Sequence, residues 1–416
     1  MLLGEEEEKT YLVLFQNNME LRPTGGFIGS FALVTFSKGR MVDINVMDVY
    51  SADGQLKGHV EPPTPIKEYL NEANWYLRDS NWDPDFPTSA DRAEWFLDKE
   101  IEKKVDGVIA VDLELVKDIV DIKGSVYLHD FDKEITAENL YEVTQYESEK
   151  DFFPGSRRKA FFLTALSQEI LNLLSSGDLN KYELAKAIYS NLDERHVQIY
   201  FHDTDAQDAV SNAYWSGEVK VPECNVENCY ADFIGFAEAN LGVNKANFFI
   251  DRSIRVKTSV SEGLVEREAS VTLKNNANSA LGNEARYKAY LRAIAPKDSF
   301  FDEVEIKGAE NKTIQPEIKY YNNRVEAGVI TQVMPGGDNI ITFKWSGKND
   351  LDLYQEGEYR MYIRKQAGVY EDPLEIMFDF PEDVNLFGIP DFSLTSEGYN
   401  GYNTTLIKDK YFLIYW

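Results

Sequence analysis

The chain has 416 residues, of which 43% are hydrophobic and 13% aromatic, and its formal net charge is −28. This length predicts two or three domains, with enough apolar side chains for real cores. The 71 acidic residues outnumber the 43 basic ones, and such an excess repels phosphate backbones, which excludes a broad nucleic-acid interface. No apolar run approaches the roughly 20 residues that span a bilayer, and no basic leader precedes the first predicted strand.

The first part of the chain alternates predicted strands with predicted helices. Short apolar runs bounded by turn residues predict strands at 11–15, 31–36, 41–49, 108–111, 126–128 and 197–201. Apolar side chains at helical spacing predict helices at 66–70, 113–120, 160–174 and 179–188, and another through 95–101 that Ser89 can cap. This alternation indicates a three-layer α/β domain, which we assign to residues 9–250.

The pattern changes beyond about residue 251, where helical periodicity ends. The predicted strands are 255–260, 269–273, 285–292, 304–306, 325–333, 340–345, 359–365 and 374–380. Short strands at this spacing, separated by turn residues, predict an antiparallel β-sandwich over residues 251–416.

The loop between the first two predicted strands combines Arg22 and Thr24 with Gly25 and Gly26. Glycines let the backbone approach a ligand closely, and an arginine beside them can form two hydrogen bonds to one anion. The loop is therefore a candidate anion site. The alternative is a strand connection whose glycines only satisfy turn geometry.

A second group of cations, Arg157, Arg158 and Lys159, lies directly before a predicted helix. The first turn of a helix carries the positive end of its dipole, which disfavours cations unless an anion binds there. Arg157 and Arg158 are therefore candidate anion ligands. The alternative is that these side chains extend into water or pair with neighbouring carboxylates.

Two loops carry candidate metal ligands. Asp48 follows a predicted strand, and Asp79 lies beside Arg78 in an aromatic and acidic segment. Carboxylate oxygens bind Mg²⁺, and carboxylates with arginines suit metal-assisted phosphoryl chemistry. The alternative is that each aspartate caps a turn. The sequence contains no Walker A loop, dinucleotide-binding fingerprint or serine-hydrolase elbow.

Cys224 and Cys229 are the two cysteines of the chain and lie in one polar segment. This arrangement favours a small loop-closing disulfide in an oxidising compartment over a zinc site, which would need more ligands. Two free thiols are the alternative.

The segment Leu21–Gly29, preceded by Gln16-Asn17-Asn18, resembles the hallmark of a bacterial family known as domain of unknown function 4012. Further matches to that family are Leu77–Trp82, Val105–Asp112, Phe153–Lys159, Asn240–Gly242, Asn244–Ala246 and Lys365–Gly368. The resemblance implies a cell-envelope protein held by an N-terminal membrane anchor that this chain lacks, and therefore an extracytoplasmic, cell-surface location.

A more distant resemblance is to the LytR–CpsA–Psr cell-wall phosphotransferases. Arg22-Pro23-Thr24 is similar to their arginine-aspartate-threonine loop, and Arg157 and Arg158 are similar to their arginine-rich helix entry. The resemblance implies that these arginines bind the pyrophosphate of a polyprenyl lipid and that Asp48 and Asp79 hold Mg²⁺ and catalyse transfer. Pro23 stands where that family has an aspartate, so anion binding is better supported than catalysis.

These observations give two hypotheses. The first is an extracytoplasmic protein that binds a polyprenyl-pyrophosphate-linked cell-wall glycan, with or without transferring it, and that uses Arg78 as a further phosphate ligand. The second is a non-catalytic surface protein for adhesion or assembly. In it, an enzyme domain that has lost its activity precedes an immunoglobulin-like sandwich.

Overall fold

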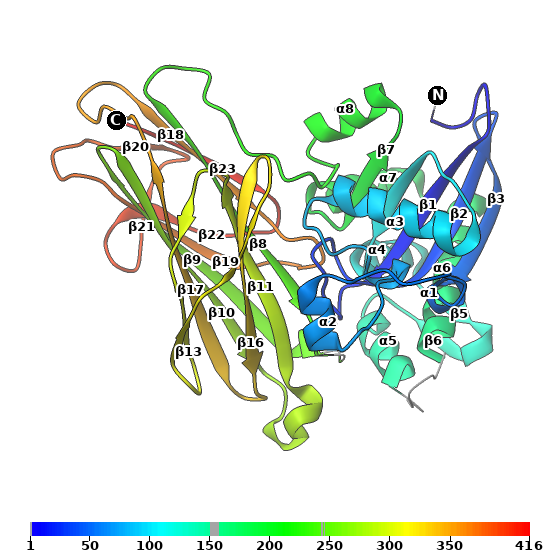
Figure 1. The fold of residues 1–416 in the computed structure, drawn as a ribbon. Coiled ribbons are helices and arrows are strands. Elements are labelled where there is room, and N and C mark those ends of the chain that lie inside the picture. The colour runs from blue at the N-terminus through cyan, green and yellow to red at the C-terminus, as the bar shows by residue number, and fades with distance from the viewer. Residues whose placement is uncertain (1, 150–157, 243, 245) are drawn as a thin grey trace. The chain divides into compact units, whose positions relative to one another are not determined.

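The computed structural model describes residues 2–149, 158–242, 244 and 246–416, and they form a mixed α/β protein with several sheets (Figure 1). The chain divides into two compact units, Met1–Val219 and Lys220–Trp416. Each unit has its own hydrophobic core.

The first unit is built on a five-stranded sheet with the order β3-β2-β1-β4-β7. In this sheet β1 and β4 are parallel, and the other neighbours are antiparallel. The strands are β1 (Lys9–Asn17), β2 (Phe27–Ser37), β3 (Arg40–Asp48), β4 (Gly107–Val111) and β7 (Val197–Phe201). The carboxyl ends of β1 and β4 therefore meet at one edge, where β2 and β7 begin.

Side-chain alternation along β1 feeds two separate cores. Leu12 and Leu14 pack with α1 (Val49–Asp53) and α3 (Phe86–Ile101) on one face. Val13 packs on the opposite face with α4 (Leu113–Lys123), α6 (Arg158–Ser176) and α7 (Lys181–Asp193). The sheet is thus covered by helices on both faces, as the alternation in the sequence predicts.

Smaller elements complete the first unit. They are α2 (Thr64–Leu70), the 3₁₀ turn η1 (Leu77–Asp79), β5 (Val126–Leu128), η2 (His129–Phe131), β6 (Lys133–Ile135), α5 (Leu140–Glu149) and α8 (Thr204–Asn212).

The start of α3 differs from the sequence prediction. Asp85, not Ser89, is the N-cap residue, and its carboxylate accepts a hydrogen bond from the backbone N–H of Thr88. Pro87 fits in the first turn because a proline there lacks only a donor that would be unpaired anyway. Ser89 is buried inside the helix, where its hydroxyl donates to the carbonyl of Asp83.

The second unit contains two large sheets that share one core. One sheet has the order β14-β13-β17-β10-β9-β19-β22-β21, with β12 paired to β17, and the other has the order β15-β16-β11-β8-β18-β23-β20. The longer strands are β8 (Cys229–Asn240), β9 (Ile250–Ser261), β10 (Leu264–Asn275), β11 (Tyr287–Pro296), β16 (Arg324–Val333), β17 (Asp338–Lys348), β18 (Glu358–Arg364), β19 (Pro373–Asp379), β22 (Asn400–Thr405) and β23 (Lys410–Tyr415). The shorter ones are β12 (Phe300–Phe301), β13 (Val304–Lys307), β14 (Lys312–Ile314), β15 (Glu317–Tyr320), β20 (Phe387–Ile389) and β21 (Ser393–Leu394), and the 3₁₀ turns are η3 (Ala246–Phe249) and η4 (Ser279–Ala285).

Two features of this unit differ from the sequence prediction. Each sheet contains a parallel pair, β8 with β18 and β9 with β19, so the sheets are not purely antiparallel. The division between the units falls at Val219 and Lys220 instead of at residue 250, because β8 is a central strand of the second unit, between β11 and β18.

Candidate functional site

The loop that joins β1 to β2 is buried, and side chains of the same chain form hydrogen bonds with it. The amide of Gln16 donates to the Thr24 hydroxyl at 3.2 Å and accepts from the Gly26 N–H at 3.1 Å. The Gln198 side chain donates to the Thr24 carbonyl at 2.6 Å. Gly25 has a φ of 138°, and a Cβ there would lie 2.0 Å from the Gln16 Oε1. The close approach of this loop to β1 therefore explains why glycines are needed there, without a ligand.

Arg22 of this loop lies against Asp79. The Arg22 Nε and Nη2 donate to the Asp79 Oδ1 at 3.2 and 3.1 Å, and both side chains are buried. The Arg22 guanidinium also lies 5.6 Å from the centre of the Phe27 ring. A carboxylate thus occupies the position that a ligand anion would take.

Arg78 is engaged in the same way on the α1 side. Its guanidinium donates to Asp53 at 2.7 Å, forms an ion pair with Glu72 at 3.0 Å and stacks on the Tyr76 ring at 4.4 Å. Burial raises the pKa of Asp53 to about 7, against the opposing effect of Arg78. Burial and the charge of Asp53 raise the pKa of Glu100, on α3, to about 8.

Asp48 is the N-cap of α1, and its carboxylate accepts from the N–H groups of Tyr50 and Ser51 and from the Ser51 hydroxyl. Because Asp48 and Asp79 both accept hydrogen bonds from protein donors, their arrangement does not fit Mg²⁺. Across the described residues no group of three or more His, Cys, Asp or Glu side chains is placed to hold a metal ion.

The four remaining predicted residues are far from the Arg22 loop in the sequence. Arg157 lies outside the described residues, and Arg158 is the first residue of α6. In the second unit Cys224 forms a disulfide with Cys229, the first residue of β8, with a Cα–Cα distance of 5.8 Å.

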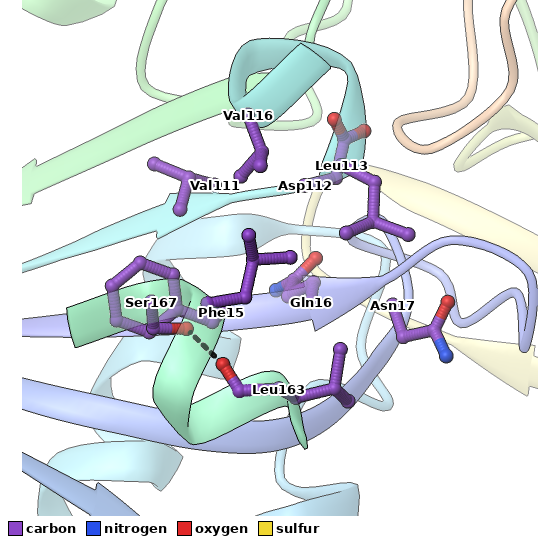
Figure 2. A pocket seen from close by; sticks show the side chains of 10 residues that line it. Phe15, Gln16, Asn17, Val111, Asp112, Leu113, Val116, Leu163 and Ser167 are labelled. Atoms are coloured by element: carbon purple, nitrogen blue, oxygen red, sulfur yellow. Dashed lines mark hydrogen bonds between the residues drawn. The ribbon is translucent and has the colours of Figure 1, made fainter. Parts of the chain in front are cut away.

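A small apolar pocket lies where β1 and β4 end, with a cavity volume of about 20 Å³. Figure 2 shows Val116 and Leu113 of α4 on one side and Leu163 of α6 on the other, with Phe15 between them. The full lining is Phe15, Gln16, Asn17, Val111, Asp112, Leu113, Val116, Leu163, Leu166 and Ser167. Ligands of open α/β sheets bind at this edge, beyond the carboxyl ends of parallel strands.

Sequence reasoning missed a buried acid–imidazole pair at the same edge. The Asp112 Oδ2 lies 2.7 Å from the His196 Nδ1, and both residues are buried. Asp112 also caps α4 through the N–H of Glu114 at 2.9 Å. The sequence does place both residues at strand ends. Asp112 directly follows the predicted strand 108–111, and His196 directly precedes the predicted strand 197–201.

Comparisons with known proteins add little about activity. The sequence matches no curated protein. The solved structure of the transcriptional regulator yvhJ from Bacillus subtilis is 13% identical with a TM-score of 0.27, over 50% of this chain and 77% of that one. An M1 zinc metallopeptidase from Deinococcus radiodurans is 10% identical with a TM-score of 0.24, over 40% of this chain and 42% of that one. These TM-scores are too low to support an argument from either structure.

The described part of the chain contains no helix that is both long and apolar enough to cross a membrane. Residues 6–148, which contain β1 to β4 and the Arg22 loop, match the family described as protein of unknown function (DUF4012).

Proposed function

We propose that the first unit binds an anionic prenyl lipid, namely the polyprenyl-pyrophosphate carrier of a cell-wall glycan, outside the cytoplasm. The observation that carries this proposal is the placement of α6. This helix begins at Arg158, and two of its next turns contribute Leu163 and Leu166 to the apolar pocket. In the sequence the cations Arg157, Arg158 and Lys159 directly precede the turns of α6 that line the apolar pocket, an order that would suit an amphiphile with an anionic head.

The proposal is for binding without transfer. Arg22, Asp48 and Asp79 hold the first unit together, so the side chains expected to catalyse are engaged by protein partners. Because these side chains interact with protein partners, we favour a domain of LytR–CpsA–Psr type that has lost catalysis and has kept a lipid pocket. The two-sheet second unit would then act as an immunoglobulin-like module at the cell surface. The Cys224–Cys229 disulfide supports an oxidising, extracytoplasmic compartment.

The lipid pocket is tested by comparing geranylgeranyl pyrophosphate with inorganic pyrophosphate in calorimetry at one salt concentration. The prenyl chain should strengthen binding at least tenfold, because its apolar surface leaves water. Val116→Phe fills the pocket and should remove that difference. Ile122→Phe, on the same helix but outside the pocket lining, should keep it. Equal affinities of the two ligands for the parent protein would reject the lipid pocket.

The head-group site needs a second pair of variants. Arg157→Ala with Arg158→Ala should weaken pyrophosphate binding at least tenfold, since a charge-assisted contact contributes about 1.5 to 3 kcal/mol. Lys103→Ala with Lys104→Ala removes two exposed cations before the opposite end of β4 and should change nothing. If both double variants bind alike, the α6 entry is not the anion site.

A further inference from the structure

A second pocket of the first unit lies on the α3 side of the sheet and contains about 970 Å³ of space open to solvent. Three of the chain's six tryptophans line it. Its full lining is Trp75, Ser80, Trp82, Asp83, Thr88, Asp91, Arg92 and Trp95. None of these residues belongs to the apolar pocket at the ends of β1 and β4.

The helical repeat explains one wall of this pocket. Positions 88, 91, 92 and 95 of α3 follow the spacing that places side chains on one face of a helix. The opposite face carries Phe86, Ala90, Ala93, Phe96 and Leu97, which are buried against the sheet. Positions 75–83, on either side of η1, form the other wall.

The centre of this pocket is a stack of rings around one cation. The Arg92 guanidinium lies 4.7 Å from the Trp75 ring centre and 5.4 Å from that of Trp95. In the described residues no carboxylate forms an ion pair with Arg92. Trp95 keeps 38% of its surface exposed, although it is one of the largest apolar side chains. An exposed aromatic surface beside unpaired donors is typical of a binding site.

The buried hydroxyl of Ser80 is a second, independent indication that a ligand binds in this pocket. It lines the pocket with 1% of its surface exposed, and its hydroxyl has no hydrogen-bond partner within the described part of the chain. A buried polar group without a partner costs about 1 to 3 kcal/mol. A ligand hydroxyl or a water molecule in the pocket would relieve that cost.

We propose that this pocket binds a pyranose ring of a neutral oligosaccharide. The flat C–H face of an all-equatorial sugar matches the exposed surface of Trp95, and its hydroxyls match Arg92, Asp91 and Ser80. A cationic ligand would be repelled by Arg92, which already lies over both rings, and an anionic one by Asp83 and Asp91. The inference goes beyond the lipid pocket and stands even if that pocket binds nothing.

Titration of the full-length protein with cellotetraose and with chitotetraose, followed by tryptophan fluorescence, tests this site. At least one sugar should bind saturably, and Trp95→Ala should weaken that binding at least tenfold. Arg92→Ala should do the same, whereas Lys99→Ala, on the same helix, and Tyr182→Ala, an exposed aromatic on α7, should bind as the parent does.

Val116→Phe should leave sugar binding unchanged, which separates this site from the lipid pocket. Asp91→Asn, at an exposed position, provides a second readout if Trp95→Ala lowers the melting temperature. No saturable binding of either sugar, or equal affinity in the parent and Trp95→Ala, would overturn the proposal. Binding of tetramethylammonium in place of the sugars would overturn it as well.

Discussion

Arg22 and Asp79 illustrate how a residue that suggests a ligand can instead be part of the scaffold. Their two hydrogen bonds lie in a buried environment, where removal of one charge leaves the other unpaired. We expect Asp79→Asn to lower the free energy of unfolding by about 3 to 5 kcal/mol. Arg22→Met combined with Asp79→Leu should recover most of that loss. Urea denaturation measures both, and an unchanged Asp79→Asn variant would show that Arg22 is available to a ligand.

Asp53 and Glu100 predict a dependence of stability on pH. Their pKa values of about 7 and about 8 lie above the value near 4 of an unfolded chain, so the folded protein binds more protons. Their contribution to stability is therefore complete below about pH 4 and is lost as the pH rises through about 8. Glu100→Gln keeps an acceptor for the Leu77 N–H and should flatten this fall. Unfolding free energies across that range measure it, and identical pH profiles would contradict the prediction.

The disulfide gives a third prediction for single residues. Cys224 and Cys229 close a very short loop, for which loop entropy predicts a stabilisation of only about 2 kcal/mol. Protein exported by its native host should resist alkylation until it is reduced, as non-reducing mass spectrometry would show. Two alkylatable thiols in that protein would place it in a reducing compartment.

Helix α3 shows what local sequence patterns can and cannot locate. The helical spacing of its apolar side chains predicts the helix, but Ser89 and Asp85 are both good capping residues, and only the fold decides between them. Asp85→Ala should cost about 1 to 2 kcal/mol, because the Asp85 carboxylate also accepts from the Val219 N–H. Ser89→Ala should cost less, since it removes one internal hydrogen bond. Thermal unfolding of the two variants would compare them, and the reverse order would contradict the capping assignment.

Strand β8 shows why part of the fold escapes a reading of the sequence. It contains two acidic residues, Asp232 and Glu238, which are fully buried although acids seldom are. Asp232 pairs with Arg267 at 2.9 Å, and Glu238 lies 3.4 Å from Arg252. Both arginines lie on later strands, so no local pattern shows that these acids can be buried.

Residues of the candidate site also pair with partners that lie far away in the sequence. The strands at its edge follow from short apolar runs, and the sequence predicted β4 to within one residue. It placed the end of β1 two residues too early and the start of β2 four residues too late. The partners of Arg22 and His196 lie 57 and 84 positions away in the chain. Only the paired strands bring such residues together, so the sequence offered Arg22 as an anion ligand and left His196 without a role.

At the scale of the whole molecule, β8 decides where the second unit begins. It lies between β11 and β18, and its Ile234 and Phe236 belong to the core that the two large sheets share. A fragment that starts at residue 251 loses this strand, so two strands lose their hydrogen-bonding neighbour and the core is left open. We therefore expect that a fragment cut at the boundary drawn from the sequence cannot complete its core.

We expect residues 220–416 to fold alone, with an all-β circular dichroism spectrum and one cooperative melting transition, because this unit contains a complete core. Residues 251–416 should show neither cooperative melting nor dispersed amide signals in NMR spectra. Adding the separate peptide 220–250 to the shorter fragment provides the control, since recovery of the transition would show that β8 is the missing element. A cooperative transition in residues 251–416 alone would mean that β8 is dispensable, and it would return the domain boundary to residue 250.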